Sequence, residues 1–366
     1  MKIILRDTFH QPEVLGGGTL YPVLLAQALS RAGARVGVAS PVPELFPTCE
    51  VYTTKGIVSS SRWIRAARWG WATFPFRRHH TDADVVIFVN QLEPLVPTGP
   101  ARRISVVYDL IPLLFPEDYP VLCRYYRHYF GHVLTRVDYI VAISQNTKKD
   151  IQNFYHIPDG KIEVIYCGFN PAVCGEVSEP RDALFQSRYG DYILYVGSHF
   201  PHKNLPRLIR AFAILRKRFS LNLVLVGKTD SRFTPAYMDL AETLGVKTFV
   251  HFLGMLPQHE LRAVVREARV LVCPSLYEGF GMTPLEGMAA GTPVAVSRTS
   301  SFPEVCGDAA VYFDPLNVGE IAEALRNLLE NSRLREQCIL AGLERSKKFS
   351  WDNTAQQYLK MFARLE

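Results

Sequence analysis

Short apolar runs alternate with longer segments of helical periodicity along nearly the whole chain. In one such segment, Leu208, Phe212, Leu215 and Phe219 recur at spacings of four, three and four residues, which places them on one face of a helix. Runs typical of buried strands cover residues 2–5, 84–89, 104–108, 139–143, 192–196, 221–226, 249–253, 270–273 and 294–296. Strands that alternate with helices in this way predict the α/β class with parallel sheets.

The length of the chain predicts two domains, because 366 residues correspond to two units of roughly 150 residues each. Residues 168–190 are rich in glycine and proline and show little periodicity, which is typical of a hinge. We therefore predict two Rossmann-like domains, at 1–170 and 185–350, facing each other across a cleft and joined by a linker at 171–184. The last helix, within 351–366, has an apolar face and is expected to pack back on the first domain.

The charge balance argues against a dedicated nucleic-acid binder. Lys and Arg number 41 and Asp and Glu number 35, so the formal net charge is only +6, whereas nucleic-acid binders carry a denser basic balance. Seven cysteines without a Cys-x-x-Cys pair are typical of reduced thiols in a cytoplasmic protein. The N-terminal apolar run is too short for a signal peptide, and no run approaches the ~18 apolar residues of a membrane span. We expect a cytoplasmic protein, and peripheral attachment at the inner face of the membrane stays open.

The densest group of candidate functional residues follows the predicted strand at 270–274. A glycine-bearing loop at 279–283 comes next, and Pro284 suits the first turn of a helix. Free backbone N–H groups and the positive end of the helix dipole favour a phosphate at such a place. Glu278 stands at the mouth of the loop, and Glu286 is predicted in the first helical turn, where it could accept hydrogen bonds from a diol. Taken singly, each carboxylate is equally well explained by solvation or by the helix dipole, but the pair with its glycines favours a ligand site.

This segment resembles the E-x7-E motif of retaining glycosyltransferases with the GT-B fold, because seven residues separate Glu278 from Glu286. The full segment is similar to glycosyltransferase family 4. The resemblance covers nearly the whole chain, through the motifs at 16–18, 144–148, 196–205, 227–228 and 349–351 in that order. It implies a GT-B pair of Rossmann-like domains, with a nucleotide-sugar donor bound mainly by the second domain and a glycan or lipid-linked acceptor bound by the first.

The resemblance also assigns roles within the segment. Glu278 matches the glutamate that lies near the donor sugar, and Glu286 matches the glutamate that binds the ribose of the nucleotide. Backbone amides at the start of the helix are expected to face the sugar hydroxyls and the diphosphate. The donor-binding residues expected here are Phe280, Gly281, Met282, Thr283 and Glu286.

Basic residues follow two neighbouring strands. A single lysine in such a place is normally a solvated surface residue, but Lys203 and Lys228 stand at equivalent positions, which favours an anion site. The resemblance implies that they neutralise the departing nucleotide diphosphate. Ser198 stands where some family members carry arginine, so the charge would rest more on the lysines. Gly17 and Gly18 precede a helix and are expected to bring the backbone close to the donor diphosphate, although flexible-loop glycines are an alternative.

Asp109 is the candidate polar group of the first domain. It follows the predicted strand at 104–108, and members of the family often carry histidine at the position of Tyr108. Because that histidine is absent, Asp109 is expected either to orient the acceptor or to accept its proton. A turn cap is an equal alternative for the same side chain.

Asp82 and Asp84 form a D-x-D sequence, which binds a divalent metal in the other large glycosyltransferase fold. Their place directly before a predicted strand is typical of solvated loop acids. The GT-B resemblance implies that lysines and helix dipoles carry the phosphate charge. We therefore expect no metal and no other cofactor, and no cluster of His, Cys and Asp suggests zinc.

Residues 59–80 have the most unusual composition of the chain. They carry five arginines and no acid, interleaved with tryptophan and phenylalanine, so this one segment accounts for most of the net charge of +6. Such a composition suits an anionic membrane surface or a phosphate-bearing lipid-linked acceptor. It also suits single-stranded nucleic acid, although no RNA-binding motif accompanies it. An amphipathic helix with its tryptophans on the core is an equal alternative to the membrane interpretation.

Together these observations predict a retaining hexosyltransferase that moves a hexose from a nucleotide diphosphate sugar to a hydroxyl of a polysaccharide or lipid-linked glycan. UDP-glucose and GDP-mannose are the main donor candidates, with a slight preference for UDP-glucose. Two alternatives remain: a nucleotide-sugar 2-epimerase of the same architecture, and a non-catalytic nucleotide-sugar-binding component of a polysaccharide assembly complex.

Overall fold

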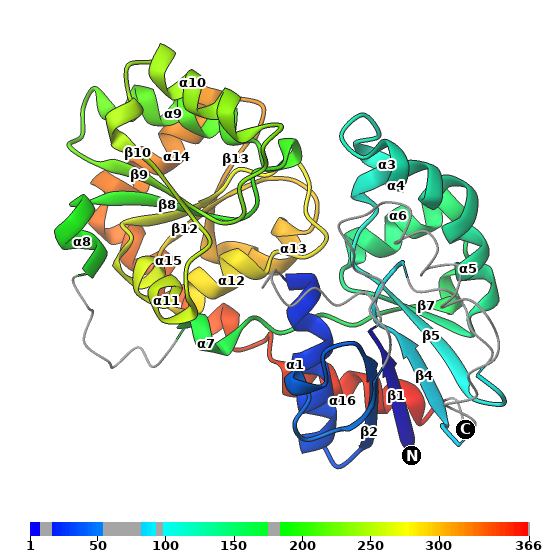
Figure 1. Cartoon of the computed structure of the whole chain (residues 1–366). Helices are drawn as coiled ribbons and strands as arrows, with labels where there is room; N and C mark the ends of the chain where they lie inside the picture. Colours follow the sequence, from blue (N-terminus) through cyan, green and yellow to red (C-terminus); the bar gives the residue numbers. More distant parts are fainter. Residues whose placement is uncertain (8–16, 54–81, 93–97, 175–183, 365–366) are drawn as a thin grey trace. The chain divides into compact units, whose positions relative to one another are not determined.

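The computed structural model describes residues 1–7, 17–53, 82–92, 98–174 and 184–364. The chain divides into two compact units (Figure 1): residues 1–168 with 350–366 form the first, and residues 169–349 form the second. Each unit is a parallel sheet with helices, as the α/β pattern of the sequence predicts. The basic segment at 59–80 lies outside the described residues.

The first unit contains a seven-stranded sheet in the order β3-β2-β1-β4-β5-β6-β7. Its strands are β1 (Lys2–Arg6), β2 (Arg35–Ser40), β3 (Glu50–Thr53), β4 (Val85–Phe88), β5 (Arg102–Val107), β6 (Tyr139–Ala142) and β7 (Ile162–Val164). Every described pairing is parallel. The central strands β1 and β4 are buried along their whole length, which explains why they appear in the sequence as continuous apolar runs.

The helices of the first unit follow the strands in chain order. They are α1 (Gly17–Arg31), α3 (Ile111–Leu114), α4 (Pro120–Tyr125), a π-helical turn (Tyr126–Phe130), α5 (Gly131–Arg136), α6 (Gln145–Tyr155) and the C-terminal α16 (Trp351–Phe362). Ser144 caps α6, because its side chain accepts a hydrogen bond from the Thr147 N–H at 2.9 Å. Gly17 and Gly18 form the first turn of α1 rather than a loop.

Helix α16 belongs to the first unit although it comes last in the sequence. It packs against α1, and the two buried hydroxyls of Tyr21 and Tyr358 lie 2.9 Å apart. Thr354 donates a hydrogen bond to the Tyr166 carbonyl at 2.8 Å. The apolar face that the sequence contains at this end therefore packs on the sheet unit formed by the beginning of the chain.

The second unit contains a six-stranded parallel sheet in the order β10-β9-β8-β11-β12-β13. Its strands are β8 (Tyr192–Val196), β9 (Asn222–Val226), β10 (Val250–Gly254), β11 (Val270–Cys273), β12 (Val294–Ser297) and β13 (Ala310–Phe313). The helices are α7 (Pro171–Cys174), α8 (Leu184–Tyr189), α9 (Leu205–Arg216), α10 (Thr234–Thr243), α11 (Gln258–Glu267), α12 (Met282–Ala289), α13 (Phe302–Cys306), α14 (Val318–Glu330) and α15 (Ser332–Ser346). Apolar side chains of α9 and α14 form one cluster with β8, β9 and β11.

The chain enters the second unit at Phe169, which is earlier than the linker predicted from the composition at 171–184. The boundary falls after Gly168, and the helix Pro171–Cys174, which we had assigned to the linker at 171–184, packs on α11 and α12 of the second unit. The chain returns to the first unit at Ser350. Gly168 packs directly against this returning segment, since a Cβ on Gly168 would come within 2.6 Å of the Trp351 backbone nitrogen. Only glycine fits so close an approach of two backbones.

Candidate active site

The candidate site is built at the carboxyl ends of the strands of the second unit, where parallel α/β sheets bind ligands. Strand β11 ends at Cys273, and the loop that follows it leads into α12 at Met282. Gly281 takes φ +120°, and a Cβ there would lie 3.1 Å from the Phe302 ring. No side chain caps this helix among the described residues. The N–H groups of Met282 and Thr283 therefore stay available to an anion at the positive end of the helix dipole.

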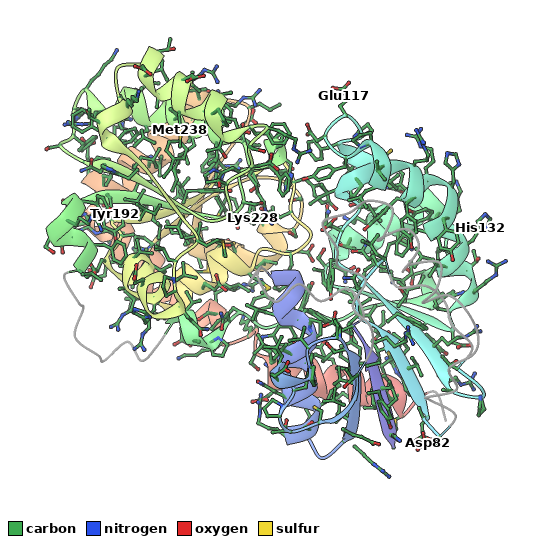
Figure 2. All side chains as sticks on the ribbon, viewed as in Figure 1. Asp82, Glu117, His132, Tyr192, Lys228 and Met238 are labelled. Carbon is green, nitrogen blue, oxygen red and sulfur yellow. The ribbon has the colours of Figure 1, made fainter. Side chains whose placement is uncertain are left out.

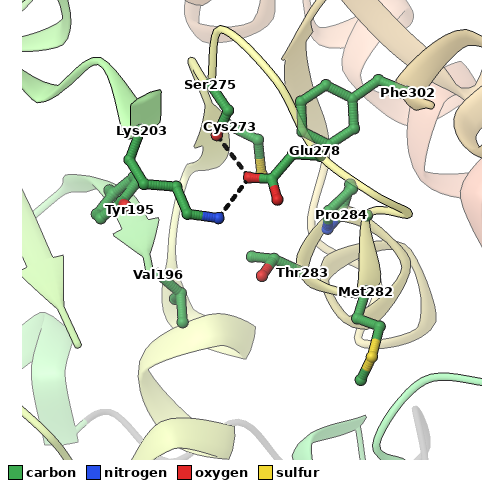
Figure 3. A pocket seen from close by; sticks show the side chains of 11 residues that line it. Tyr195, Val196, Lys203, Cys273, Ser275, Glu278, Met282, Thr283, Pro284 and Phe302 are labelled. Atoms are coloured by element: carbon green, nitrogen blue, oxygen red, sulfur yellow. Dashed lines mark hydrogen bonds and ion pairs between the residues drawn. The ribbon is translucent and has the colours of Figure 1, made fainter. Parts of the chain in front are cut away.

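Glu278 and Lys203 form the central ion pair of the site (Figure 3). The Lys203 Nζ lies 2.7 Å from Glu278 Oε1, and the Ser275 hydroxyl donates to the same oxygen at 2.7 Å. Burial alone would raise the pKa of Glu278, but the charge of Lys203 and the two hydrogen bonds outweigh it and lower the pKa. Glu278 is therefore an ionised hydrogen-bond acceptor at neutral pH, with one oxygen held by the protein.

The loop that carries Lys203 is anchored by its neighbour. Asn204 takes φ +62°, and its buried amide donates to the carbonyls of Pro274 at 2.9 Å and Pro315 at 2.8 Å. His202 is buried beside the ion pair, and burial together with the charge of Lys203 lowers its pKa to about 3. His202 is thus neutral. The sequence analysis did not assign Ser275, His202 or Asn204 to the site, although they flank its motifs.

Glu286 lies one turn inside α12, because the helix begins at Met282 and not at the later residue that Pro284 suggests. Burial raises the pKa of Glu286 to about 7, and a hydrogen bond from the Asn170 N–H opposes this shift. Glu286 is the fifth residue of α12, so our placement of it in the first helical turn is wrong by about one residue. The carboxyl group nevertheless stays on the helix that follows the glycine loop.

The other donor-side residues take different environments. Lys228, labelled in Figure 2, follows β9 and is exposed, with no ion pair within the described part of the chain. Gly227 before it approaches Gly197 so closely that a Cβ would lie 2.0 Å from the Gly197 oxygen. The Ser198 carbonyl accepts the Tyr195 hydroxyl at 2.7 Å. Phe280 is buried, with its ring on Phe349, so its side chain supports the loop from the interior.

One pocket brings together five of the predicted residues, and Ser198, Lys228, Phe280 and Glu286 are not part of its described lining. Its described lining consists of Tyr195, Val196, Lys203, Cys273, Ser275, Glu278, Gly281, Met282, Thr283, Pro284 and Phe302. The close-up shows Thr283 and Met282 at the start of α12, beside the ion pair (Figure 3). A carboxylate, a lysine and a helix N-terminus therefore meet in one place, which suits a ligand that carries both hydroxyls and phosphates.

The candidate residues of the first unit are occupied by contacts of their own fold. The Asp109 carboxylate accepts the Ile111 N–H at 3.0 Å, which is the turn-capping role. The Gln91 amide donates to the Asp109 carbonyl at 2.8 Å and accepts the Tyr108 N–H at 3.0 Å. The Tyr108 hydroxyl donates to the Val89 carbonyl, so this side chain is held against the end of β4.

The D-x-D sequence lies at the amino ends of the strands of the first sheet, whereas Asp109 lies at their carboxyl ends. Asp82 pairs with the Lys2 ammonium at 2.5 Å, and Asp84 accepts the Lys2 N–H at 2.7 Å. Both acids therefore fix the amino ends of β1 and β4.

Within the described residues, no helix is long and apolar enough to cross a membrane.

Both halves of the chain match models of glycosyltransferase domains. The "Glycosyltransferase Family 4" model matches residues 15–173, and the "Glycosyl transferases group 1" model matches residues 181–345. Two parallel-sheet units with this site define a glycosyltransferase of the GT-B fold. The chain belongs to glycosyltransferase family 4.

Two curated relatives are identical to the chain at about a third or less of the aligned positions. O-antigen chain mannosyltransferase B of Escherichia coli is 27% identical over 316 residues, which cover 84% of this chain and 80% of that protein. The serotype-specific mannosyltransferase WbdA of Escherichia coli is 30% identical over 277 residues, which cover 73% of this chain. That alignment spans only 34% of WbdA.

Solved structures share the fold over the full length. Sucrose-phosphate synthase from Thermosynechococcus elongatus superimposes with a TM-score of 0.80 at 19% identity, covering 100% of this chain and 99% of that one. WaaG, a glycosyltransferase of lipopolysaccharide biosynthesis, superimposes with a TM-score of 0.74 at 20% identity over 98% and 99% of the two chains. HepE of Anabaena, solved in complex with UDP and glucose, gives 0.74 at 18% identity with both chains fully covered.

Proposed function

We propose that this protein transfers a hexose from a nucleotide diphosphate sugar to a hydroxyl of a polysaccharide or lipid-linked glycan, with retention at the anomeric carbon. The observation that carries the proposal is the ion pair of Glu278 and Lys203 beside the uncapped N-terminus of α12. An ionised carboxylate binds sugar hydroxyls, whereas a lysine and free N–H groups bind phosphate. A nucleotide sugar carries both kinds of group within one molecule.

The positive groups stabilise the leaving nucleoside diphosphate. Negative charge develops on the phosphate when the bond between the anomeric carbon and the phosphate oxygen breaks. The N–H groups of Met282 and Thr283, the helix dipole and the ammonium groups of Lys203 and Lys228 are the groups that we assign to this charge. We propose that they do so without a metal. Activity should then survive an excess of EDTA.

The two glutamates hold the donor at its two ends. With one oxygen bound to Lys203 and Ser275, Glu278 accepts hydrogen bonds from the sugar hydroxyls through the other. Glu286 accepts hydrogen bonds from the ribose diol. Ser198, Gly17 and Gly18 complete the proposed donor contacts through their backbones.

A same-face substitution accounts for retention in the proposed reaction. The new bond forms between the acceptor oxygen and the anomeric carbon on the face that the phosphate leaves, and the acceptor proton passes to the departing phosphate oxygen. Asp109 is our candidate for orienting the acceptor hydroxyl. Its capping bond to Ile111 uses one carboxylate oxygen and fixes the plane of the group.

The names of the relatives favour mannose over the glucose that the sequence analysis preferred. Four of the curated relatives aligned over 73% or more of this chain are mannosyltransferases. We therefore place GDP-mannose first among the donors and an O-antigen-like chain first among the acceptors. UDP-glucose stays second, because HepE of the same fold was solved with UDP-glucose. A cytoplasmic location, where nucleotide sugars are made, and attachment to a membrane surface through 59–80 remain part of the proposal.

A panel of nucleotide sugars tests the proposal. The purified protein is incubated with GDP-mannose, GDP-glucose, UDP-glucose and UDP-galactose, and both thermal stabilisation and nucleotide release are followed. One donor should raise the melting temperature and release its nucleotide faster when a glycan acceptor is added. If no donor stabilises the protein, the enzymatic function is refuted.

A further inference from the structure

Two serines of a neighbouring loop bind the backbone of the loop that carries Glu278. The Ser300 hydroxyl accepts the Glu278 N–H at 3.0 Å. The Ser301 hydroxyl donates to the Glu278 carbonyl at 3.0 Å and also to the Phe280 carbonyl. Both serines lie between β12 and α13, more than twenty positions away in the sequence.

The backbone conformation of Ser300 and the burial of Ser301 both restrict this loop. Ser300 takes φ +50°, one of three positive values among the described residues other than glycine. Residues other than glycine seldom adopt this left-handed backbone conformation, and they do so where the surrounding structure holds them in it. Ser301 is fully buried, at 0% exposure. Both observations indicate that the loop is held in one position by side chains that cannot easily turn away.

The next residue completes the contact. Gly281 lies against the Phe302 ring, since a Cβ there would come within 3.1 Å of it, which is a tight contact. Residues 300–302 therefore support the loop at Glu278, at Phe280 and at the entry into α12. The carboxylate of Glu278 is held from the other side by Lys203 and Ser275.

We propose that Ser300 and Ser301 are positioning residues for the transfer reaction, because they fix the backbone that aims Glu278 at the donor sugar. The inference rests on the proposed function. Neither serine is among the described residues that line the pocket, so their effect on the sugar passes through Glu278. Binding of the nucleotide, which we assign to Lys228, Glu286 and the helix N-terminus, should depend on them far less.

Three variants and one control test this role. Ser301→Ala removes both bonds to the carbonyls, and Ser300→Ala removes the acceptor for the Glu278 N–H. Ser300→Asn keeps an acceptor and tolerates positive φ. Ser297→Ala is the matched control, because Ser297 is equally buried and donates to the Cys273 carbonyl of β11 at 3.3 Å without contacting the loop.

The readouts are kcat and two affinities measured by calorimetry, for GDP-mannose and for GDP, or for UDP-glucose and UDP if the wild type prefers them. A displacement of about 1 Å in an active site can lower the rate ~100-fold. We expect kcat to fall ~10- to 100-fold in Ser301→Ala and Ser300→Ala, with a full binding stoichiometry. The affinity for the free nucleotide should stay within about twofold of the wild type, while the additional affinity that the sugar provides is lost. Ser300→Asn should recover most of kcat.

The outcomes separate the two proposals. A wild type that binds and uses no nucleotide sugar refutes the proposed function before any variant is made. An active wild type whose serine variants lose no more kcat than Ser297→Ala refutes the positioning role. The same conclusion follows if the affinities for nucleotide and nucleotide sugar fall together. If Ser301→Ala fails to fold, the comparison of Ser300→Ala with Ser300→Asn decides alone.

Discussion

Glu278 and Glu286 are two glutamates of one motif, separated by seven residues, and the protein shifts their pKa values in opposite directions. Burial tends to raise both pKa values. At Glu278 the charge of Lys203, 2.7 Å away, and the hydrogen bonds of Lys203 and Ser275 together outweigh burial and lower the pKa. At Glu286 the backbone N–H of Asn170 opposes burial only in part, and the pKa rises to about 7. The local partner, and not the residue type, therefore decides which glutamate is charged before a ligand arrives.

The difference suits two tasks. In the function we propose, an ionised Glu278 would accept hydrogen bonds from the hydroxyls of a sugar at any pH near neutrality. Glu286, with a pKa of about 7, is only partly ionised near neutral pH, and in the function we propose the hydrogen bonds of a diol would favour its ionised form. The proposed function would thus use one acceptor that is ionised beforehand and one whose ionisation depends on its ligand.

The largest expected effect follows Glu278→Gln. The variant removes the charged acceptor and leaves the ammonium of Lys203 without its partner, so kcat should fall ~100-fold or more, as for the loss of a key electrostatic group in an active site. Nucleotide release in the presence of acceptor measures the effect. Glu344→Gln is the control, since Glu344 is an exposed glutamate paired with Lys347. Equal activities of the two variants would contradict the assigned role.

Lys203→Met should make Glu278 resemble Glu286. Without the ammonium, burial dominates and raises the pKa of Glu278 above its usual range. The variant should therefore lose ~10- to 100-fold in kcat/KM at the acid end of the pH profile, where more of the carboxyl is protonated, and recover part of it as the pH rises. The wild type should show no such rise from this group. A pH profile of the variant parallel to that of the wild type would show that Lys203 does not control Glu278.

The raised pKa of Glu286 predicts a pH-dependent stability. An acid whose folded pKa lies above its unfolded value stabilises the fold fully below the unfolded pKa, here 4.5, and this stability is lost as the pH rises through about 7. Glu286→Gln removes the dependence. Near pH 8.5 the free energy of unfolding of the variant should exceed that of the wild type by up to about 3 kcal/mol, because one pKa unit corresponds to about 1.4 kcal/mol.

Chemical denaturation at about pH 4.5 and about pH 8.5 measures this difference, and the two proteins should match at the lower value. The same variant should bind the nucleotide ~10-fold more weakly at high pH, since a neutral amide replaces a charged acceptor. Unchanged affinity would refute the ribose assignment. A constant stability difference across the pH range would show that Glu286 is not buried as an acid.

Much of this fold could be predicted from the sequence, because central strands such as β1, β4, β11 and β12 are buried throughout and appear as apolar runs. The strand β11 and the glycine loop before α12 also follow from local chemistry. The start of α12 at Met282 did not follow, because Pro284 is compatible with several positions in a first turn. The linker was misplaced for a similar reason, since Pro171 begins a helix that packs on the second unit.

The partners of Glu278 could not be predicted, since sequence distance hides them. Lys203 lies 75 positions away and Ser300 lies 22 positions away. Neither contact has a periodicity or a motif that would reveal it. The interpretation of 59–80 as a membrane-binding segment or as an amphipathic helix stays a prediction, because that segment lies outside the described residues.

The smallest expected effect follows Ser275→Ala, which tests how much of the contrast depends on one hydroxyl. Its hydrogen bond to Glu278 Oε1 is 2.7 Å long and one of several causes that lower the pKa of Glu278. The charge of Lys203 stays in the variant, so the carboxylate stays ionised and kcat should fall only ~3- to 10-fold, as for the loss of one ordinary hydrogen bond. A pH profile like that of Lys203→Met would instead show that the hydroxyl, and not the ammonium, keeps Glu278 unlike Glu286.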